Sequence, residues 1–429
     1  MKHFGTDGIR CKADEFTEEY LRKIALGIAY LSDCRKVVIG RDPRVSGKRI
    51  EKTLTKVLSE NGVEVLLAGM IPTPCLAFLT ALYRCDYGIM LSASHNPPEY
   101  NGIKLFASDG SKVSKATEQA VEDSIERGIM LLRYLKAPVS EIDGKEHYIK
   151  YLLDRIKPDL KGQKILLDTA NGATSEIAKE LFSRTGADVV AFNTETDGVN
   201  INCGCGATVP KFLLEKCRDA DYDIAFTYDG DGDRVMCVQD GKIFNGDHLM
   251  YVHCKDMMTR GELVENTMVG TVMSNLGTEK ACKAAGINLV RTAVGDKCVY
   301  REMVKKGYNV GGEESGHMIF SDYLKTGDGI LASLLTACLN MKKRVSEADD
   351  IVECPSVSDC IICDKEAIAK FNASEEIRKF LSSVPSEYRI VVRPSGTEPK
   401  IRILVEAEQT EKASAFASEI KKYIEERVL

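Results

Sequence analysis

A serine and a histidine stand side by side in residues 92–97, which read Ser-Ala-Ser-His-Asn-Pro. They directly follow residues 88–91, an apolar run typical of a buried strand. Because open α/β sheets collect their chemistry beyond the carboxyl ends of strands, Ser94 is a candidate nucleophile with His95 beside it. A serine hydrolase would carry a Gly-x-Ser-x-Gly elbow, which this chain lacks. The alternative is a turn serine before a helix-stopping Asn-Pro pair, and these six residues alone favour that alternative.

An acidic loop follows a second apolar run. Residues 229–234 read Asp-Gly-Asp-Gly-Asp-Arg, and alternate residues of an extended turn point the same way. Three carboxylates can then face one point, where they need a cation, and an all-oxygen ligand set suits Mg²⁺. An EF-hand is disfavoured because Arg234 stands where that turn needs glycine, and because the flanks are strands. A solvated acidic turn is the alternative, but such a turn seldom follows so apolar a strand.

Two further loops carry hydrogen-bonding groups. Residues 311–317 (Gly-Gly-Glu-Glu-Ser-Gly-His) mix glycines with polar side chains, which suits a polyhydroxylated ligand, although a charged glycine-rich turn is weak evidence alone. Residues 393–400 (Arg-Pro-Ser-Gly-Thr-Glu-Pro-Lys) lie between two predicted strands. An arginine, two hydroxyls and a glycine amide on a hairpin-like loop can form a phosphate cradle, and neutral turn chemistry is the alternative.

The elements that must position these loops repeat three times. Residues 36–91, 165–228 and 268–310 each read as strand, helix, strand, helix, strand. Such β-α-β-α-β units form mostly parallel sheets with right-handed crossovers, so the loop after each closing strand should occupy an equivalent position. Three loops could then converge on one cleft. The fold class predicted is α/β, with three such mixed-sheet domains and a C-terminal α+β domain around a central cleft.

Length and composition set the wider frame. A chain of 429 residues suggests three or four domains, and we predict four, at residues 1–141, 142–246, 247–351 and 352–429. The net charge of -6 and the lack of a basic run argue against a nucleic-acid partner. No signal peptide or membrane span is evident, which predicts a cytoplasmic protein without a membrane partner. The spacing of the fifteen cysteines favours scattered reduced thiols over zinc ligands or disulfides.

Together the four loops resemble one family, the α-D-phosphohexomutases, over essentially the whole chain. The resemblance rests on residues 92–97, 229–234, 312–317 and 393–397, in that order. Residues 4–10 (Phe-Gly-Thr-Asp-Gly-Ile-Arg), the loop at 312–317 and residues 326–329 (Thr-Gly-Asp-Gly) are most similar to bacterial phosphoglucosamine mutases. This implies interconversion of glucosamine 6-phosphate and glucosamine 1-phosphate, with phosphomannomutase or phosphoglucomutase activity as the nearest alternative. Three residues depart from the family pattern without removing a catalytic group, namely Cys11, Lys297 and Glu314.

The resemblance also implies cofactors and residue roles. The active form would carry phosphate on Ser94 and one Mg²⁺ per chain, with a sugar 1,6-bisphosphate as intermediate and activator. The implied metal ligands are Ser94, Asp229, Asp231 and Asp233. The implied catalytic residues are Ser94, His95, Lys104 and Arg10, with a lowered pKa expected for Lys104 as general acid/base. The implied substrate-binding residues are Arg234, Glu313, Ser315, His317, Arg393, Ser395, Gly396 and Thr397. A phosphosugar is the expected partner, a homodimer is left open, and the C-terminal domain is expected to hinge.

Two other classes of function compete with this interpretation. An apolar strand leading into Asp229 and Asp231 mimics the nucleophile motif of haloacid-dehalogenase-type phosphatases, but the distal acidic pattern of that class is missing. A catalytically silent sugar-phosphate sensor would not need Ser94 or the three aspartates. The position of a phosphate on Ser94, on Asp229 or on neither would separate the three functions.

Overall fold

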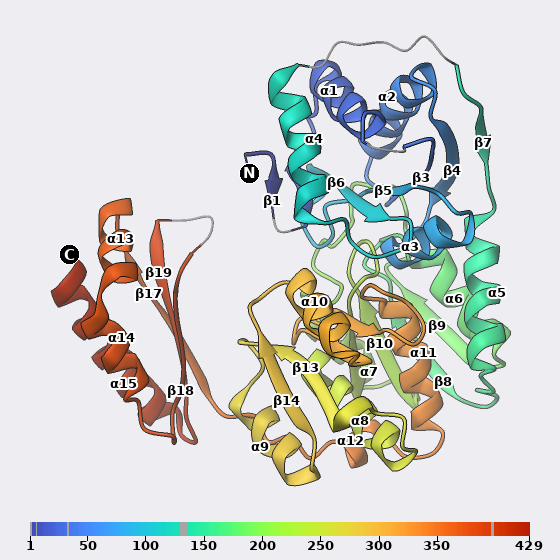
Figure 1. Ribbon diagram of the computed structural model, residues 1–429. Helices are drawn as coiled ribbons and strands as arrows, with labels where there is room; N and C mark the ends of the chain where they lie inside the picture. Colours follow the sequence, from blue (N-terminus) through green and yellow to red (C-terminus); the bar gives the residue numbers. More distant parts are fainter. Residues whose placement is uncertain (1, 6, 32–33, 129–135, 396–398) are drawn as a thin grey trace.

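The computed structural model describes residues 2–5, 7–31, 34–128, 136–395 and 399–429. Within these ranges the strands form four sheets that follow one another along the chain, and we call each sheet with its helices domain I, II, III and IV (Figure 1). Each of the four residue ranges predicted from the sequence contains one whole sheet. The junctions between those ranges stay a prediction.

Domain I has seven strands in the order β1-β2-β6-β5-β3-β4-β7. The strands are β1 Phe4–Gly5, β2 Gly8–Lys12, β3 Lys36–Arg41, β4 Glu64–Met70, β5 Tyr87–Leu91, β6 Tyr100–Ala107 and β7 Val139–Glu141. The helices are α1 Glu18–Ala29, α2 Gly47–Glu60, α3 Thr73–Leu82 and α4 Lys115–Arg127. Local signals fix the helix ends: the Ser114 side chain caps α4 by accepting a hydrogen bond from the Thr117 amide, and Gly128 ends it in a left-handed conformation.

Domain II has five strands in the order β12-β11-β10-β8-β9. Its strands are β8 Lys164–Asp168, β9 Asp188–Phe192, β10 Ile224–Tyr228, β11 Val235–Gln239 and β12 Lys242–Phe244, and its helices are α5 Gly144–Ile156, α6 Ser175–Arg184 and α7 Lys211–Cys217. All five residues of β10 are buried, as expected for a central strand with both faces covered.

Domains III and IV complete the chain. The strands of domain III are β13 Thr267–Thr271, β14 Asn288–Thr292, β15 Val310–Gly312 and β16 Met318–Phe320, and its helices are α8 Gly246–Thr259, η1 Val264–Asn266, α9 Leu276–Ala285, α10 Asp296–Lys306, α11 Gly329–Asn340 and α12 Val345–Ala348. Domain IV has antiparallel strands β17 Ser356–Ile362, β18 Arg389–Pro394 and β19 Lys400–Glu406, with helices α13 Lys365–Ala373, α14 Glu375–Ser382 and α15 Thr410–Val428. The predicted hairpin at β18–β19 and the predicted C-terminal helix are confirmed.

One strand pattern recurs in the first three domains. The first strand of each predicted repeat pairs in parallel with the second and the third, as in β3 with β4 and β5. An antiparallel strand then follows the third, and the three pairs are β5–β6, β10–β11 and β15–β16. The loop between the third strand and its antiparallel partner therefore leaves the same place in each sheet. These three loops are the ones that carry the serine, the aspartates and the Glu-Glu-Ser-Gly-His sequence.

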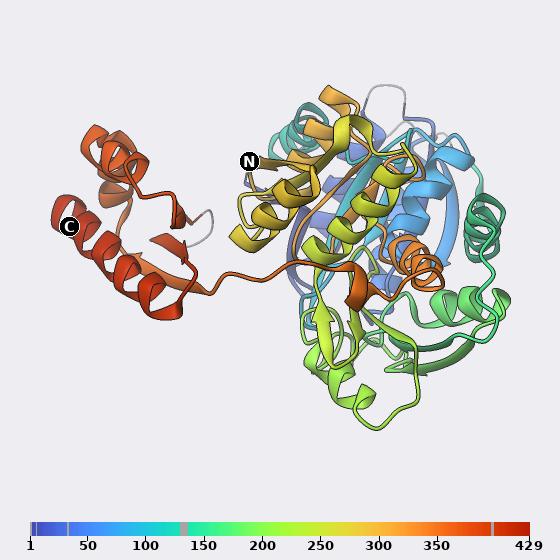
Figure 2. The ribbon, with the colours of Figure 1, turned by 90° about the horizontal axis from the view of Figure 1, so that it is seen from below.

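The first three domains share a core and the fourth does not. A single cluster of buried side chains runs from domain I through II to III, and includes Leu79, Tyr148, Phe226, Met250 and Ile330. Domain IV packs around its own cluster, and Figures 1 and 2 show it projecting to one side of the others. The loops of domains I to III are thus held together by shared packing, whereas domain IV has a core of its own.

The structure describes all fifteen cysteines, and each is a free thiol. Among the described residues, no helix combines the length and apolar character needed to cross a bilayer.

Candidate active site

Ser94 follows β5 and is almost fully buried, with 1% of its surface exposed. Its Oγ donates a hydrogen bond to Asp229 Oδ2 at 2.7 Å, and His95 Nδ1 lies 3.4 Å from Ser94 Oγ. The backbone of Ser94 is left-handed, with φ of 51°. A non-glycine residue adopts this conformation only where its surroundings impose it, and such residues gather at functional sites. The hydroxyl group is therefore held in place against the acidic loop.

A buried arginine holds the serine loop. The guanidinium of Arg44 pairs with Asp42 at 2.9 Å, and both side chains are fully buried. The same guanidinium donates to the carbonyl oxygens of Ser94 at 2.9 Å, Asn96 at 2.7 Å and Tyr100 at 3.0 Å. Five donors in a rigid fork suit this clamp, which a lysine could not reproduce.

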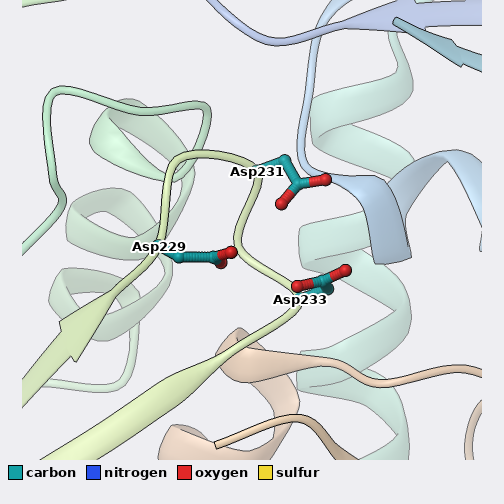
Figure 3. A group of neighbouring side chains, drawn as sticks. All are labelled: Asp229, Asp231 and Asp233. Carbon is teal, nitrogen blue, oxygen red and sulfur yellow. The ribbon is translucent and has the colours of Figure 1, made fainter. Parts of the chain in front are cut away.

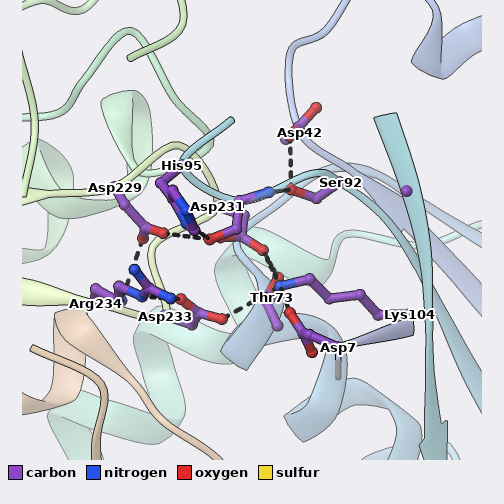
Figure 4. Close-up of polar contacts among 12 residues, drawn as sticks. Asp7, Asp42, Thr73, Ser92, His95, Lys104, Asp229, Asp231, Asp233 and Arg234 are labelled. Carbon is purple, nitrogen blue, oxygen red and sulfur yellow. Dashed lines mark hydrogen bonds and ion pairs between the residues drawn. The ribbon is translucent and has the colours of Figure 1, made fainter. Parts of the chain in front are cut away.

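Asp42 fixes the same loop from the other side. It accepts a hydrogen bond from Ser92 Oγ at 2.7 Å, and Ser92 Oγ accepts one from the Ser94 amide at 2.9 Å (Figure 4). Neither Asp42 nor Arg44 belongs to a motif that predicts this role. Their position directly after β3 was the available signal, since β3 is the parallel neighbour of β5 and ends at the same edge of the sheet.

The three aspartates after β10 converge as predicted from their spacing (Figure 3). One carboxylate oxygen from each of Asp229, Asp231 and Asp233 lies within 4.8 Å of the other two, and all three residues are buried. Oδ1 of Asp231 and Oδ1 of Asp233 have no hydrogen-bond partner among the described residues although both atoms are buried. Buried, unpartnered carboxylate oxygens at this separation fit a divalent cation such as Mg²⁺, so this trio could hold the metal.

The charges in the acidic loop are unequal. Burial together with repulsion from Asp233 and Asp231 raises the pKa of Asp229 well above its ordinary value. Asp233 behaves in the opposite way: burial alone would raise its pKa, but attraction to Lys104, His317 and Arg234 together lowers it to about 2. The negative charge of Asp229 therefore lacks a compensating positive charge, which a bound cation would supply.

Lys104 lies on β6 with its ammonium group buried among carboxylates (Figure 4). Nζ is 2.8 Å from Asp231, 2.8 Å from Asp7 and 3.3 Å from Asp233. Burial alone would lower the pKa of Lys104, but attraction to these three carboxylates raises it well above its ordinary value. The lowered pKa expected from the sequence is wrong for this structure, because acids outnumber cations around Nζ. Lys104 is a charged proton donor here.

A cleft of about 430 Å³ opens beside these groups. The predicted site residues that line it are Arg10, His95, Asp233, Arg234, Glu313, Ser315 and His317. Burial, together with the charges of Arg234 and Arg10, lowers the pKa of His95 to about 4, so its ring is neutral near pH 7. Two arginines and a neutral imidazole thus face the opening next to the serine loop.

The loop after β15 supplies the opposite wall. Glu313 Oε1 accepts a hydrogen bond from the Gly295 amide at 3.0 Å. Both ring nitrogens of His317 are buried without a hydrogen-bond partner among the described residues, and its Nε2 lies 3.8 Å from Asp296. Gly316 has φ of 93°, and a Cβ there would lie 2.4 Å from the Val235 carbonyl oxygen. The close approach of domains II and III therefore requires glycine at position 316. The unpartnered ring nitrogens of His317 can bind a ligand in the cleft.

The fourth loop stands apart from the other three. Arg393, at the end of β18, lines a separate cavity of about 330 Å³ with Lys400 and Arg402. Met273 lines both this cavity and the cleft. Ser395 follows β18, and Gly396 and Thr397 lie outside the described residues. Arg393 therefore lies in a different cavity from the predicted substrate-binding residues Arg234, Glu313, Ser315 and His317.

The structure also contains an ion-pair network that the sequence motifs do not predict. Lys112 Nζ pairs with Asp7 and lies 3.1 Å from Asp296, and both carboxylates line the cleft. Although burial opposes it, attraction to Asp296 and Asp7 raises the pKa of Lys112 to about 12. Asp7 connects this lysine to Lys104, so charges from domains I, II and III meet in one network. No local pattern marks Lys112, because its partners are far away in the sequence.

Comparison with known proteins identifies related families along the chain. Four family models match it, described as phosphoglucomutase/phosphomannomutase alpha/beta/alpha domains I, II and III and C-terminal domain, at residues 1–130, 146–242, 245–356 and 362–422. Phosphoglucosamine mutase of Thermotoga neapolitana is 41% identical over 99% of this chain and 99% of its own. Phosphoglucosamine mutase of Clostridioides difficile is 40% identical over 100% of this chain and 99% of its own.

Solved structures share the fold at lower identity. A phosphoglucomutase/phosphomannomutase family protein of Burkholderia thailandensis superposes with a TM-score of 0.82 at 23% identity, covering 98% of this chain and 97% of its own. N-acetylphosphoglucosamine mutase of Aspergillus fumigatus, in complex with GlcNAc-6P and magnesium, superposes with a TM-score of 0.68 at 16% identity, covering 100% of this chain and 96% of its own. With its four domains matched in order and its full length shared with such relatives, the chain belongs to the phosphoglucomutase/phosphomannomutase family.

Proposed function

We propose that this protein interconverts glucosamine 6-phosphate and glucosamine 1-phosphate through a phosphoserine at Ser94 and a sugar 1,6-bisphosphate. Relatives named phosphoglucosamine mutase, about 40% identical over the full chain, support the substrate. The observation that carries the chemistry is the contact of 2.7 Å between the buried Ser94 hydroxyl and Asp229, at the edge of a cleft lined by Arg10 and Arg234. A serine placed in this way can hold a phosphoryl group where its charge is neutralised.

The proposed reaction consists of two phosphoryl transfers, and a different phosphoryl group moves in each. A sugar hydroxyl oxygen attacks the phosphorus on Ser94, the bond to Oγ breaks, the hydroxyl proton passes to a base, and Oγ takes a proton from an acid. The resulting bisphosphate turns over in the cleft, and its other phosphoryl group returns to Ser94 by the reverse step. The charged Lys104 suits the role of acid and the neutral ring of His95 suits the role of base.

Most of the rate acceleration should come from charge and position, because phosphoryl transfer needs little covalent work from the protein. Arg10 and Arg234 would neutralise the oxygens of the transferring group. Mg²⁺, held by Asp229, Asp231 and Asp233 with an oxygen on Ser94, would supply further neutralisation there. Arg44 and Asp42 keep the loop of Ser94 fixed while both half-reactions occur.

The substrate must contact both cavities. Glu313, Ser315 and His317 would bind the sugar hydroxyls in the cleft. The phosphate that is not reacting would bind to Arg393, Ser395, Gly396 and Thr397. Since Arg393 lines a different cavity from the cleft, and since domain IV has its own core, we propose that domain IV swings toward the cleft when the substrate binds.

The test is a comparison of substrates. The protein is loaded with Mg²⁺ and glucose 1,6-bisphosphate, and turnover of glucosamine 6-phosphate, glucose 1-phosphate and mannose 1-phosphate is followed by phosphorus NMR, beside Ser94→Ala. We expect a strong preference for the aminosugar that is lost in the variant, with phosphopeptide mapping placing phosphate on Ser94. A preference for a neutral hexose would refute the substrate and keep the mechanism. Phosphate on Asp229 would indicate a phosphatase, and no turnover with no phosphate would indicate a sensor.

A further inference from the structure

A third cavity, of about 720 Å³, lies between α10 of domain III and the segment that leads into α4 of domain I. Both helices are labelled in Figure 1. This α10 cavity is larger than the cleft, and Asp296 lines both. Its volume falls within the range of roughly 300–1,000 Å³ in which proteins bind small organic ligands. None of the roles proposed above for the phosphosugar reaction uses it.

Ion pairs between domains I and III frame the α10 cavity. They join side chains that are far apart in the sequence, namely Lys112 with Asp296 at 3.1 Å, Lys325 with Asp109 at 2.9 Å, and Lys297 with Glu118. Glu118 is buried, so its pair with Lys297 is largely shielded from solvent. The cavity is therefore preformed, and a ligand would bind it without first ordering its walls.

Three other cations at the α10 cavity remain available. Lys115, Arg301 and Lys305 line it, are exposed, and form no ion pair among the described residues. Lys297, Arg301 and Lys305 follow one another at intervals of four residues, so they lie along one face of α10, while Lys115 comes from the opposite wall. The single acid in the lining, Asp296, is already paired with Lys112. Positive charges on two facing walls repel one another, and a bound anion would relieve that repulsion.

The interior of the α10 cavity has a different character. Val113 and Ile319, which are buried, and Tyr300, which is partly buried, contribute apolar or aromatic surface to its lining. A flat ring could pack against these side chains while its charged groups reach the cations at the opening. An inorganic anion would leave this apolar surface unused, and an uncharged ring would leave the cations unpaired.

We propose that the α10 cavity binds a small aromatic phosphate of the nucleoside diphosphate class, at a site separate from the phosphosugar cleft. The ring occupies the apolar interior, and the diphosphate contacts Lys115, Arg301 and Lys305. The proposal does not depend on which sugar the cleft accepts, because the two sites share only the wall formed by Asp296.

Isothermal titration calorimetry of the full-length protein with uridine diphosphate tests this proposal. The variant Arg301→Glu/Lys305→Glu reverses two exposed charges of the cavity. The control Lys211→Glu/Lys306→Glu makes the same change in net charge at exposed lysines that do not line it. We expect binding at one site per chain, a loss of affinity of about tenfold or more in the first variant, and no comparable loss in the control. Saturating glucose 1,6-bisphosphate should leave the affinity unchanged.

Four outcomes would overturn the proposal. The first is no binding of uridine diphosphate, and the second is its displacement by glucose 1,6-bisphosphate, which would place it in the cleft. An equal loss of affinity in both charge-reversal variants would mean non-specific attraction. Inorganic pyrophosphate binding as tightly as uridine diphosphate would show that the ring is not recognised, and would refute the ligand class.

Discussion

Replacing Asp229 by asparagine should stabilise the protein in the absence of metal and abolish its stabilisation by Mg²⁺. One carboxylate oxygen from each of the three aspartates lies within 4.8 Å of the other two. At an effective dielectric constant of about 20, two such charges repel by about 3 kcal/mol. Lys104 and Arg234 offset part of this repulsion, so we expect Asp229→Asn to gain about 1 to 2 kcal/mol in chelator. The amide retains an oxygen that can accept a hydrogen bond where Asp229 now accepts one from Ser94.

Mg²⁺ should reverse the order of stability. A cation that binds only the folded wild-type protein adds about 2.7 kcal/mol at one hundred times its dissociation constant, whereas the variant lacks one of the ligands. The gain in chelator should also depend on pH. The pKa of Asp229 is raised in the folded state, so wild-type stability falls as pH rises above the unfolded value of about 4. The stability that Asp229→Asn gains over wild type therefore grows between the unfolded pKa and the raised folded pKa, and is complete above the folded pKa.

Thermal unfolding of both proteins in chelator and in Mg²⁺, from pH 4 to pH 8, measures these effects. Asp219→Asn, at an exposed position outside the acidic loop, is the matched control and should change neither series. The reasoning would be refuted if Asp229→Asn were less stable than wild type in chelator, or if Mg²⁺ stabilised both proteins equally.

The serine loop and the junction with domain IV give two further predictions. Arg44→Met leaves Asp42 charged, buried and without its ion-pair partner, so it should cost about 3 kcal/mol or more of stability and most of the turnover. Adding Asp42→Asn should restore part of the stability. Thermal unfolding and turnover rates measure both effects, and a double variant no more stable than the single one would contradict the prediction. Although burial opposes the shift, hydrogen bonds to Asp349 and Glu353 raise the pKa of His248 to about 9. The contribution of His248 to stability should be complete below about pH 6.5 and lost as pH rises through about 9. His248→Gln should therefore remove this fall in stability between about pH 6.5 and about 9. An unchanged dependence of stability on pH would show that these pairs do not stabilise the junction.

The sequence determined the elements and the loops that carry the chemistry. Apolar runs, helix caps and turn residues act over a few positions, so the three repeats and the hairpin around Arg393 are legible in local patterns. Because each repeat places its third strand in the same position, the convergence of the loops of Ser94, Asp229 and Glu313 also follows from the order of elements. The spacing of Asp229, Asp231 and Asp233 was enough to predict a cluster of carboxylates.

Tertiary structure decided which charges meet around those loops. Arg44 binds the serine loop, 50 residues further along the chain, and Lys112 of domain I pairs with both Asp7 of domain I and Asp296 of domain III. These pairs depend on packing between distant segments, which no local pattern records. The raised pKa of Lys104 could not be predicted for the same reason, since the balance of burial and attraction at Nζ exists only once domains I and II are packed together. The separation of the fourth loop from the cleft is likewise a property of the packed molecule, because domain IV buries its apolar side chains in a core of its own.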